Sequence, residues 1–535
     1  MLITLTAPAF AETWYIENGD ITVKASGTEG KNTVSQGDKK DVEDTNTIIT
    51  NQKTDKASSH TVTIDAGNDK VEVTLDNVNI KADSGSALIS KGDVTLTLKG
   101  DNHLTGGNGG SGANGISSSG SLTISGGTVT ATGGDSTSSV GSGGSGIYSV
   151  SGDVTISGGT VNANGGDGKN GSGGGSGIDS SGGVTVSGGT VTANGGDGGS
   201  GSGIFSFDRV AISGGTVEAA GGNGSTGGDG ISSSSGVTVS DGTVTATGGN
   251  STGSYGSGGD GIRSDGGVTI SGGTVKAAGG DSKDGYGGDG IRSDGGVTIS
   301  GNTVNAAGGN GGKVGGYGIC SFDRVAISGG TVTANGGDGS SGGDGIRSGD
   351  IDLSGSLELT AKAGSPNGKA LSQDGKELDL DTINKDKLDP GAKVTTTDAD
   401  GKVIKQVSIP RPVEPEKPVI PEESSSSSDG GSSAPSASVS SLPGLTVTDK
   451  SGAVISYTST QSGNTLTVCV GRLTASLHVS LAALRQLRAE GIETITFQTI
   501  LCSTTLSVDE LLAMGGEDAE AVLTHRLTDS SLTVG

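Results

Sequence analysis

Hydrophobic positions between residues 87 and 375 recur with a repeat of roughly 28 residues, a spacing typical of solenoids and related arrays. A representative copy, residues 261–290, reads GIRSDGGVTISGGTVKAAGGDSKDGYGGDG. Each copy opens with a small residue followed by one apolar anchor. The anchors are Leu88, Ile116, Ile147, Ile178, Ile204, Ile231, Ile262, Ile291, Ile319, Ile346 and Leu371.

Three short runs in each copy alternate apolar and polar residues with a period of two, which indicates β-strands. In the representative copy, Val268 and Ile270 point to one side of a strand. Val275 and Ala277 continue that side after a glycine pair, and Ile262 supplies a third inward position. One such unit cannot bury its apolar side alone. Stacking it on the next copy, about 4.8 Å away, buries the apolar column and pairs every strand.

The same runs exclude other repeat architectures. No copy has the stretch of about ten residues with period 3.6 that a helical solenoid requires. A propeller blade needs about 40 residues, and glycine does not occupy every third position as in collagen. The pattern therefore predicts an all-β fold, a right-handed three-walled parallel β-helix solenoid of about 11 coils.

Changes in pattern and composition predict the order of domains. Residues 1–11 look like the remnant of a signal peptide, and residues 12–86 are expected to form an N-terminal β cap and first coils. Residues 87–408 are predicted to form the repeat domain with its terminal cap. The Pro- and Ser-rich residues 409–443 read as a linker, and residues 444–535 read as a small α+β module.

Two helices are predicted in that module. Ser480 is the expected N-cap of residues 481–490, and Ser507 is the expected N-cap of residues 508–514. Cys469 and Cys502 are candidates for one disulfide in an exported protein, although the sequence does not establish that they pair.

Charge and export signals bear on location and partners. The net charge of −25 makes nucleic acid an improbable partner. Ala9-Phe10-Ala11 is a small-x-small cleavage pattern, which predicts a secreted or cell-surface protein. No later stretch is apolar enough to span a membrane, and we expect a monomer. The alternative for the first residues is an ordinary apolar strand.

The coil pattern, GISSSGSLTISGGTVTATGGD at residues 115–135, resembles that of bacterial secreted carbohydrate-binding proteins with a pectate-lyase-like parallel β-helix. The run TVTIDAGNDKVEVTLDNVNIKADSGSALISKGDVTLTLKGDN at residues 61–102 looks like the opening coils of the same family. The resemblance covers about residues 12–375. It implies binding of a cellulose-like or pectin-like polysaccharide, from a plant cell wall or a host, with calcium held in the coils. Glycine-rich β-helix repeats also occur in adhesins.

Two acidic rows are candidate metal ligands. Stacked carboxylates repel one another, and a hard cation with six to eight oxygen ligands relieves that repulsion. The alternative is that these side chains serve the turns through bonds to the backbone. The first row is Asp135, Asp167, Asp197, Asn223, Asn250, Asp281, Asn310 and Asp338, and the second is Asp229, Asp260, Asp289 and Asp344.

A row of outward positions beside the anchors is the candidate carbohydrate surface. Aromatic faces stack on sugar rings, and arginine forks bind carboxylates. The alternative is cross-coil packing and mutual neutralisation of charges. The candidates are Tyr148, Phe205, Phe207, Arg263, Arg292, Phe322 and Arg347.

The uniformity of the copies favours a binding protein over an enzyme, because a catalytic site needs unlike residues converging at one place. No residue is singled out as catalytic, and histidine is absent between His103 and His478. The expected function is therefore non-catalytic, calcium-assisted polysaccharide binding. Two alternatives stay open. One is a protein-binding adhesin or stalk that displays the C-terminal module, and the other is a pectate-lyase-like polysaccharide lyase with Arg263, Arg292 or Arg347 as base.

Overall fold

The computed structural model describes residues 12–410 except 29 and 54, and most of residues 444–534. The gaps in that last part are residues 450–453, 456, 463, 471–473, 500–502, 515–518 and 526–529. The predicted signal remnant, residues 1–11, and residues 411–443 of the predicted linker lie outside the described residues. The chain divides into two units, residues 1–415 and 416–535.

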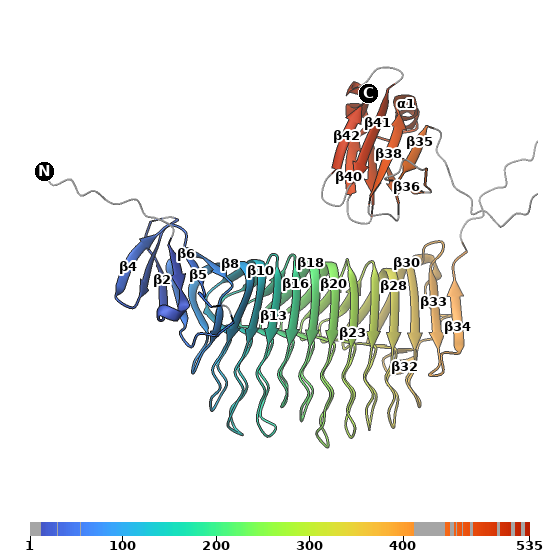
Figure 1. Cartoon of the computed structure of the whole chain (residues 1–535). Coiled ribbons are helices and arrows are strands. Elements are labelled where there is room, and N and C mark those ends of the chain that lie inside the picture. The colour runs from blue at the N-terminus through green and yellow to red at the C-terminus, as the bar shows by residue number, and fades with distance from the viewer. Residues whose placement is uncertain are drawn as a thin grey trace, which may run out of the picture. The chain divides into compact units, whose positions relative to one another are not determined.

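The first unit is a parallel β-helix, which confirms the predicted fold class (Figure 1). It has about 14 turns rather than about 11, because residues 21–76 already contribute coils. Wall 1 contains the anchor positions, whose side chains form one inward column. Its strands are β2 (Ile21–Ala25), the first residues of β6 (Val62–Asp76) and β8 (Leu88–Thr105), β9 (Ile116–Ser119), β11 (Ile147–Ser149), β14 (Ile178–Ser180), β17 (Ile204–Ser206), β19 (Ile231–Ser233), β21 (Ile262–Ser264), β24 (Ile291–Ser293), β27 (Ile319–Ser321), β29 (Ile346–Ser348) and β31 (Leu371–Gln373).

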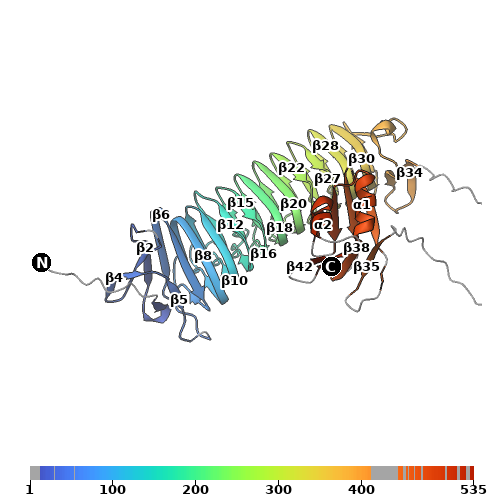
Figure 2. The ribbon, with the colours of Figure 1, turned by 90° about the horizontal axis from the view of Figure 1, so that it is seen from above.

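Walls 2 and 3 follow each wall-1 strand and are joined by a glycine-containing bend. In some coils one long strand runs through both walls, and the strands of successive coils lie side by side (Figure 2). The long strands are β10 (Leu122–Thr132), β18 (Arg209–Ala220), β20 (Gly236–Thr247), β28 (Arg324–Asn335) and β30 (Asp350–Lys362). The other coils split the walls between β12 (Val154–Ile156) and β13 (Thr160–Asn164), β15 (Val184–Val186) and β16 (Thr190–Asn194), β22 (Gly267–Ile270) and β23 (Thr274–Ala278), and β25 (Val297–Ile299) and β26 (Thr303–Ala307).

The core of the solenoid consists of in-register columns of aliphatic residues. Ile262 pairs with Ile291, Val268 with Val297, and Ala277 with Ala306. The predicted inward residues of the representative copy are all buried. Identical aliphatic residues stack on one another in these columns, and in other coils the same positions hold Leu, Ile or Val.

Hairpins and short strands complete both ends of the solenoid. At the N-terminal end, Trp14 is buried and its indole N–H donates to Asp44 at 2.8 Å. The elements there are β1 (Thr13–Tyr15), the 3-10 helix η1 (Ile16–Asn18), β3 (Asn32–Gln36), β4 (Lys39–Asp44), β5 (Ile48–Thr50) and β7 (Asn79–Lys81). Those at the other end are β32 (Lys376–Glu377), the 3-10 helix η2 (Lys385–Lys387), β33 (Lys393–Thr397) and β34 (Val403–Ser408).

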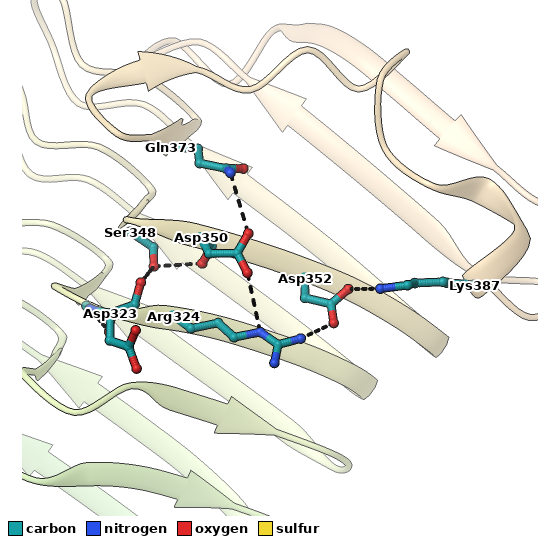
Figure 3. A network of polar contacts seen from close by, with 8 residues as sticks. Asp323, Arg324, Ser348, Asp350, Asp352, Gln373 and Lys387 are labelled. Atoms are coloured by element: carbon teal, nitrogen blue, oxygen red, sulfur yellow. Dashed lines mark hydrogen bonds and ion pairs between the residues drawn. The ribbon is translucent and has the colours of Figure 1, made fainter.

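A charge network fastens the last coils to this C-terminal end (Figure 3). Arg324 pairs with Asp350 at 3.5 Å and also with Asp352, and Lys387 donates to Asp352 at 2.9 Å. Gln373 donates to Asp350 from the neighbouring wall. Two carboxylates of one strand, β30 (Asp350–Lys362), are thus balanced by a cation from the preceding coil and one from the C-terminal end.

Glycine-rich arms connect wall 3 to the next wall 1, and in Figure 1 they extend from one side of the solenoid. The backbone of each arm bonds directly to the neighbouring arms. The N–H of Gly280 donates to Gly259 of the preceding arm at 2.8 Å, and within one arm the N–H of Gly288 donates to Gly280 at 2.9 Å. A Cβ on Gly288 would lie 1.9 Å from the Gly259 oxygen, so only glycine fits there. Nine of these arms are residues 106–115, 133–146, 165–177, 195–203, 221–230, 248–261, 279–290, 308–318 and 336–345.

The described residues of the second unit form two four-stranded sheets and two helices. Ser480 caps α1 (Leu481–Ala489) by accepting from the Ala483 N–H at 3.2 Å, and Ser507 accepts from the Glu510 N–H of α2 (Val508–Met514) at 3.4 Å. Both predicted caps are confirmed. The strands are β35 (Leu445–Thr448), β38 (Ala475–Ser480), β41 (Glu520–His525) and β42 (Ser530–Val534) in one sheet, and β36 (Thr458–Ser462), β37 (Thr465–Cys469), β39 (Thr494–Gln498) and β40 (Ser503–Ser507) in the other.

Candidate functional site

The outer face of wall 1 carries the most varied side chains of the solenoid. We call the residue after each anchor the outer row, and the residue two before each anchor the flank row. From β9 to β29 the outer row reads Ser117, Tyr148, Asp179, Phe205, Ser232, Arg263, Arg292, Cys320 and Arg347. The flank row of the same coils reads Asn114, Ser145, Ser176, Ser202, Asp229, Asp260, Asp289, Tyr317 and Asp344.

The first predicted row of acidic and amide residues, from Asp135 to Asp338, lies on the arms, and we call it the arm row. Its composition has a structural explanation. In each coil the side-chain oxygen accepts the backbone N–H of the equivalent residue in the next coil. Asp135 accepts from Asp167 at 3.0 Å, and Asp197 accepts from Asn223 at 2.8 Å. The same bond recurs at Asp167, Asn223, Asn250, Asp281, Asn310 and Asp338. Asparagine serves this role as well as aspartate, which explains why both occur.

The described residues do not fit a calcium shell. They contain no group of three or more His, Cys, Asp or Glu side chains arranged to hold a metal ion. In the arm row, one oxygen of each carboxylate is already used by a backbone N–H, and amides separate several of the carboxylates. Calcium binding stays a prediction for which these residues provide no ready site.

The acidic flank row differs because most of it is buried, with Asp229 of intermediate exposure. Asp260 and Asp289 are 7% and 4% exposed. Asp229 accepts from the N–H of Asp260 at 2.8 Å, Asp260 from that of Asp289 at 2.7 Å, and Asp289 from that of Tyr317 at 2.7 Å. Three carboxyl groups on successive coils are thus held in one line beneath the outer row.

Burial changes the protonation of these three groups. It raises the pKa of Asp229 and Asp289, the latter to about 6, against the opposing effects of backbone N–H groups and arginines. Asp260 lies between the other two, so burial and then repulsion from Asp289 and Asp229 raise its pKa well above the ordinary value. The row therefore carries less negative charge than three ordinary aspartates would at the same pH.

Arginines and tyrosines complete a groove of about 520 Å³ between wall 1 and the returning limbs of the arms. Arg263 and Arg292 line it, and Arg292 pairs with Asp289 at 3.4 Å. Tyr286 and Tyr317 line the arm side. The groove also contains Asp229, Asp260 and Asp289, so it presents guanidinium groups, aromatic rings and hydroxyls to one ligand.

Neighbouring residues extend this groove. Arg347 donates to the Tyr317 hydroxyl at 2.5 Å and lies over its ring at 5.0 Å. The Arg292 guanidinium lies 5.2 Å from the centre of the Phe322 ring. Lys313, on an arm, lies 4.5 Å from the Tyr255 ring centre. These cation–aromatic contacts hold the charged groups in place along the face.

The structure gathers some of the predicted residues and separates others. Arg263, Arg292, Asp229, Asp260 and Asp289 share the groove, and Arg347 and Phe322 adjoin it. Asp344 is a buried flank residue that accepts from the Lys369 N–H at 2.8 Å. Tyr148, Phe205 and Phe207 lie towards the N-terminus, with Phe205 on the coil next to that of Asp229, and the arm row forms its own line.

Sequence reasoning missed Tyr317, Tyr286 and Asp179. Tyr317 occupies the flank position that aspartate holds in neighbouring copies, so alignment of the copies could have identified it. The position of Tyr286 in the groove depends on the path of its arm, and the arm sequences have no periodic pattern from which that path could be predicted. The Cys320 thiol is buried, which raises its pKa to about 12 and keeps it protonated. Cys502 lies outside the described residues, and the Cys469 sulfur lies 3.6 Å from the Gln498 side-chain oxygen.

Comparison with known proteins supports the architecture. A family model described as a beta helix repeat matches residues 122–146, 154–176, 184–204, 268–291 and 325–344. No curated protein and no solved structure matches the chain. No helix among the described residues has the length and apolar character needed to cross a membrane. The matched stretches all lie within the solenoid, so the chain is one that carries beta helix repeats.

Proposed function

We propose that this protein is an exported, non-catalytic polysaccharide-binding protein whose glycan lies along the outer face of wall 1. The observation that carries the proposal is the groove of about 520 Å³, which combines Arg263 and Arg292 with the rings of Tyr286 and Tyr317. Sugar rings stack on aromatic faces, and arginine forks bind carboxylate groups of acidic sugars. The open length of the solenoid suits a chain of repeating units.

A binding role is favoured over lyase chemistry by how the groove charges are arranged. Arg292 is paired with Asp289, and Arg347 donates to Tyr317. A guanidinium engaged in this way orients and neutralises anions, and it gives up a proton only with difficulty because its pKa exceeds about 12. The arginines of the groove are therefore suited to binding anionic groups and not to acting as the base of a lyase.

The test uses the full chain and its retention on immobilised polygalacturonate and on a neutral β-glucan. The double variant Arg263→Gln/Arg292→Gln removes two groove cations. Lys276→Gln, on the outer side of wall 3 in the same coil as Arg263, is the matched control for loss of positive charge. We expect the double variant to lose at least about tenfold in affinity for the acidic glycan, as loss of charge-assisted hydrogen bonds implies. The control should bind as the parent does.

Other outcomes of that experiment contradict the proposal. Equal retention of the double variant and the control places the glycan elsewhere. Shortened chains with unsaturated ends make the protein a lyase, and no retention on any glycan favours the adhesin or stalk. Repeating the experiment with a chelator tests the predicted calcium assistance. The described residues contain no cluster of metal ligands, so the chelator tests a prediction from the sequence.

A further inference from the structure

A second set of unusual side chains lies on wall 1, towards the N-terminus from the groove. In the outer row, Tyr148, Asp179 and Phe205 occupy three successive coils in register. Val150 and Phe207, two residues beyond Tyr148 and Phe205, lie beside them. We call these five residues the aromatic strip. The flank positions beside the strip are serines rather than aspartates, so no arginine–aspartate pairs reach it.

The strip exposes apolar surface that the solenoid does not need for packing. Phe207 is 58% exposed and Val150 is 48% exposed, although both follow a buried serine on a regular wall. The rings of Phe205 and Phe207 meet edge to face with centres 4.8 Å apart. That contact fixes both rings in position and leaves part of the Phe207 ring open to solvent. Contiguous exposed apolar and aromatic surface is a feature of interaction sites.

Asp179 is placed differently from the other acids of wall 1. Asp260 and Asp289 accept backbone N–H groups and lie near arginines, whereas no hydrogen bond or ion pair is found for Asp179 among the described residues. Its side chain is half-buried between the coils that carry Tyr148 and Phe205. Burial alone raises its pKa to about 6. The Asp179 carboxylate loses part of its hydration and gains no hydrogen bond or ion pair in return. A cation brought by a ligand would therefore stabilise its charged form.

The missing partner is best supplied by an ammonium group. A cation over an aromatic face is attracted by the ring, and an ion pair with the carboxylate adds a charge-assisted hydrogen bond. A neutral hydroxyl would leave the charge of Asp179 uncompensated, and an anion would be repelled. A sugar that bears a protonated amine also offers the flat ring that Tyr148 or Phe205 can stack against.

We propose that the aromatic strip is a second subsite, which binds amino-sugar residues through the Asp179 carboxylate and the rings of Tyr148 and Phe205. The inference rests on the proposed function, because it assigns a sugar class to another part of the same glycan-binding face. Wall 1 would then bind anionic sugars at the groove that contains Arg263 and Arg292, and cationic sugars at the aromatic strip.

The experiment measures the affinity of the full chain for glucosamine oligosaccharides and for their N-acetylated counterparts, at a pH where the amine is protonated. Asp179→Asn keeps the shape of the side chain and removes its charge. Asp294→Asn, an exposed acid on the same wall, is the control for the general attraction of a chain with net charge −25 to any polycation. Tyr148→Ala and Phe205→Ala test the rings.

We expect Asp179→Asn and each ring variant to weaken binding of the glucosamine oligosaccharide at least tenfold, whereas Asp294→Asn leaves it unchanged. The N-acetylated oligosaccharide should bind the parent weakly and be insensitive to Asp179→Asn. Equal binding by Asp179→Asn and Asp294→Asn overturns the subsite. Binding of oligolysine, but not of glucosamine oligosaccharides, through Asp179 overturns the sugar assignment in favour of a peptide.

One further outcome separates this inference from the proposed function. If polygalacturonate is retained through Arg263 and Arg292 while glucosamine oligosaccharides do not bind, the subsite is wrong and the proposed function stands. If no glycan of any kind binds, both are wrong.

Discussion

The walls and the arms of the solenoid are built from the same repeat but pack in opposite ways. The walls stack side chain on side chain, with columns such as Ile262 on Ile291 buried in register. The arms stack backbone on backbone, and Gly288 lies so close to Gly259 that no side chain fits. The groove lies between wall 1 and the arms. Its wall-1 side carries side chains such as Arg263 and Arg292, and its arm side is mainly glycine backbone with a few side chains such as that of Tyr286. Variation is therefore tolerated on the outer row and is restricted in the arms.

The largest effect should come from breaking the column of a wall. Ile291→Ala removes a fully buried side chain between Ile262 and Ile319, where rigid neighbouring coils cannot collapse into the cavity. We expect a loss of about 2–5 kcal/mol in the free energy of unfolding. Denaturant unfolding measures it, and a loss below about 1 kcal/mol would show that the column is not tightly packed.

Breaking the backbone packing of an arm should cost somewhat less. In Gly288→Ala the added methyl group meets the Gly259 carbonyl oxygen, so the two arms must separate, at a cost of about 1–3 kcal/mol. Gly110→Ala is the matched control, because it lies in another arm with no atom within 4 Å of the added Cβ. Similar thermal unfolding of the two variants would contradict the close packing of the arms.

Removing the unpartnered charge from wall 1 should stabilise the protein in a pH-dependent way. Burial raises the pKa of Asp179 to about 6 in the folded state, whereas the unfolded chain has the ordinary pKa of about 3.9. Between pH values of about 3.9 and about 6, Asp179 therefore binds a proton more often in the folded state than in the unfolded state. Stability of the parent therefore falls as the pH rises through that window, whereas Asp179→Asn lacks this loss.

The two-unit rise corresponds to at most about 3 kcal/mol, and solvent screening of a half-buried group reduces it to about 1–2 kcal/mol. Denaturant unfolding should show Asp179→Asn more stable than the parent at pH 7 and equal to it below about pH 4. A destabilised variant at pH 7 would mean that Asp179 has a partner in the fold.

The smallest effect is expected in the arm row. Asp197→Asn keeps the oxygen that accepts the Asn223 N–H at 2.8 Å, as the natural asparagines of this row do. The free energy of unfolding should change by no more than about 0.5 kcal/mol. A large loss that calcium alone restores would show that the row binds the metal.

The walls could be predicted from the sequence because apolar and polar residues alternate along each strand and every copy repeats this alternation. Val268, Ile270 and Ala277 point inward as expected. The first coils were underestimated because their anchors, Ile21 and Val62, lack the glycine-rich arms that identify later copies.

The candidate site was only partly predictable. Arg263, Arg292 and the buried Asp260 follow from their position beside the anchors. The role of Asp197 as a backbone acceptor depends on where its carboxylate lies relative to the next coil, and sequence spacing does not fix that. Tyr286 likewise reaches the groove only because the arm returns along wall 1.

Hydrogen–deuterium exchange of the full chain, with and without polygalacturonate, tests most directly whether wall 1 is the glycan-binding face. The account predicts slower exchange in residues 257–264, 286–292 and 314–319, which line the groove, and unchanged exchange in residues 274–278 of wall 3. Protection confined to wall 3 or to residues 444–535, with none in the groove, would contradict it.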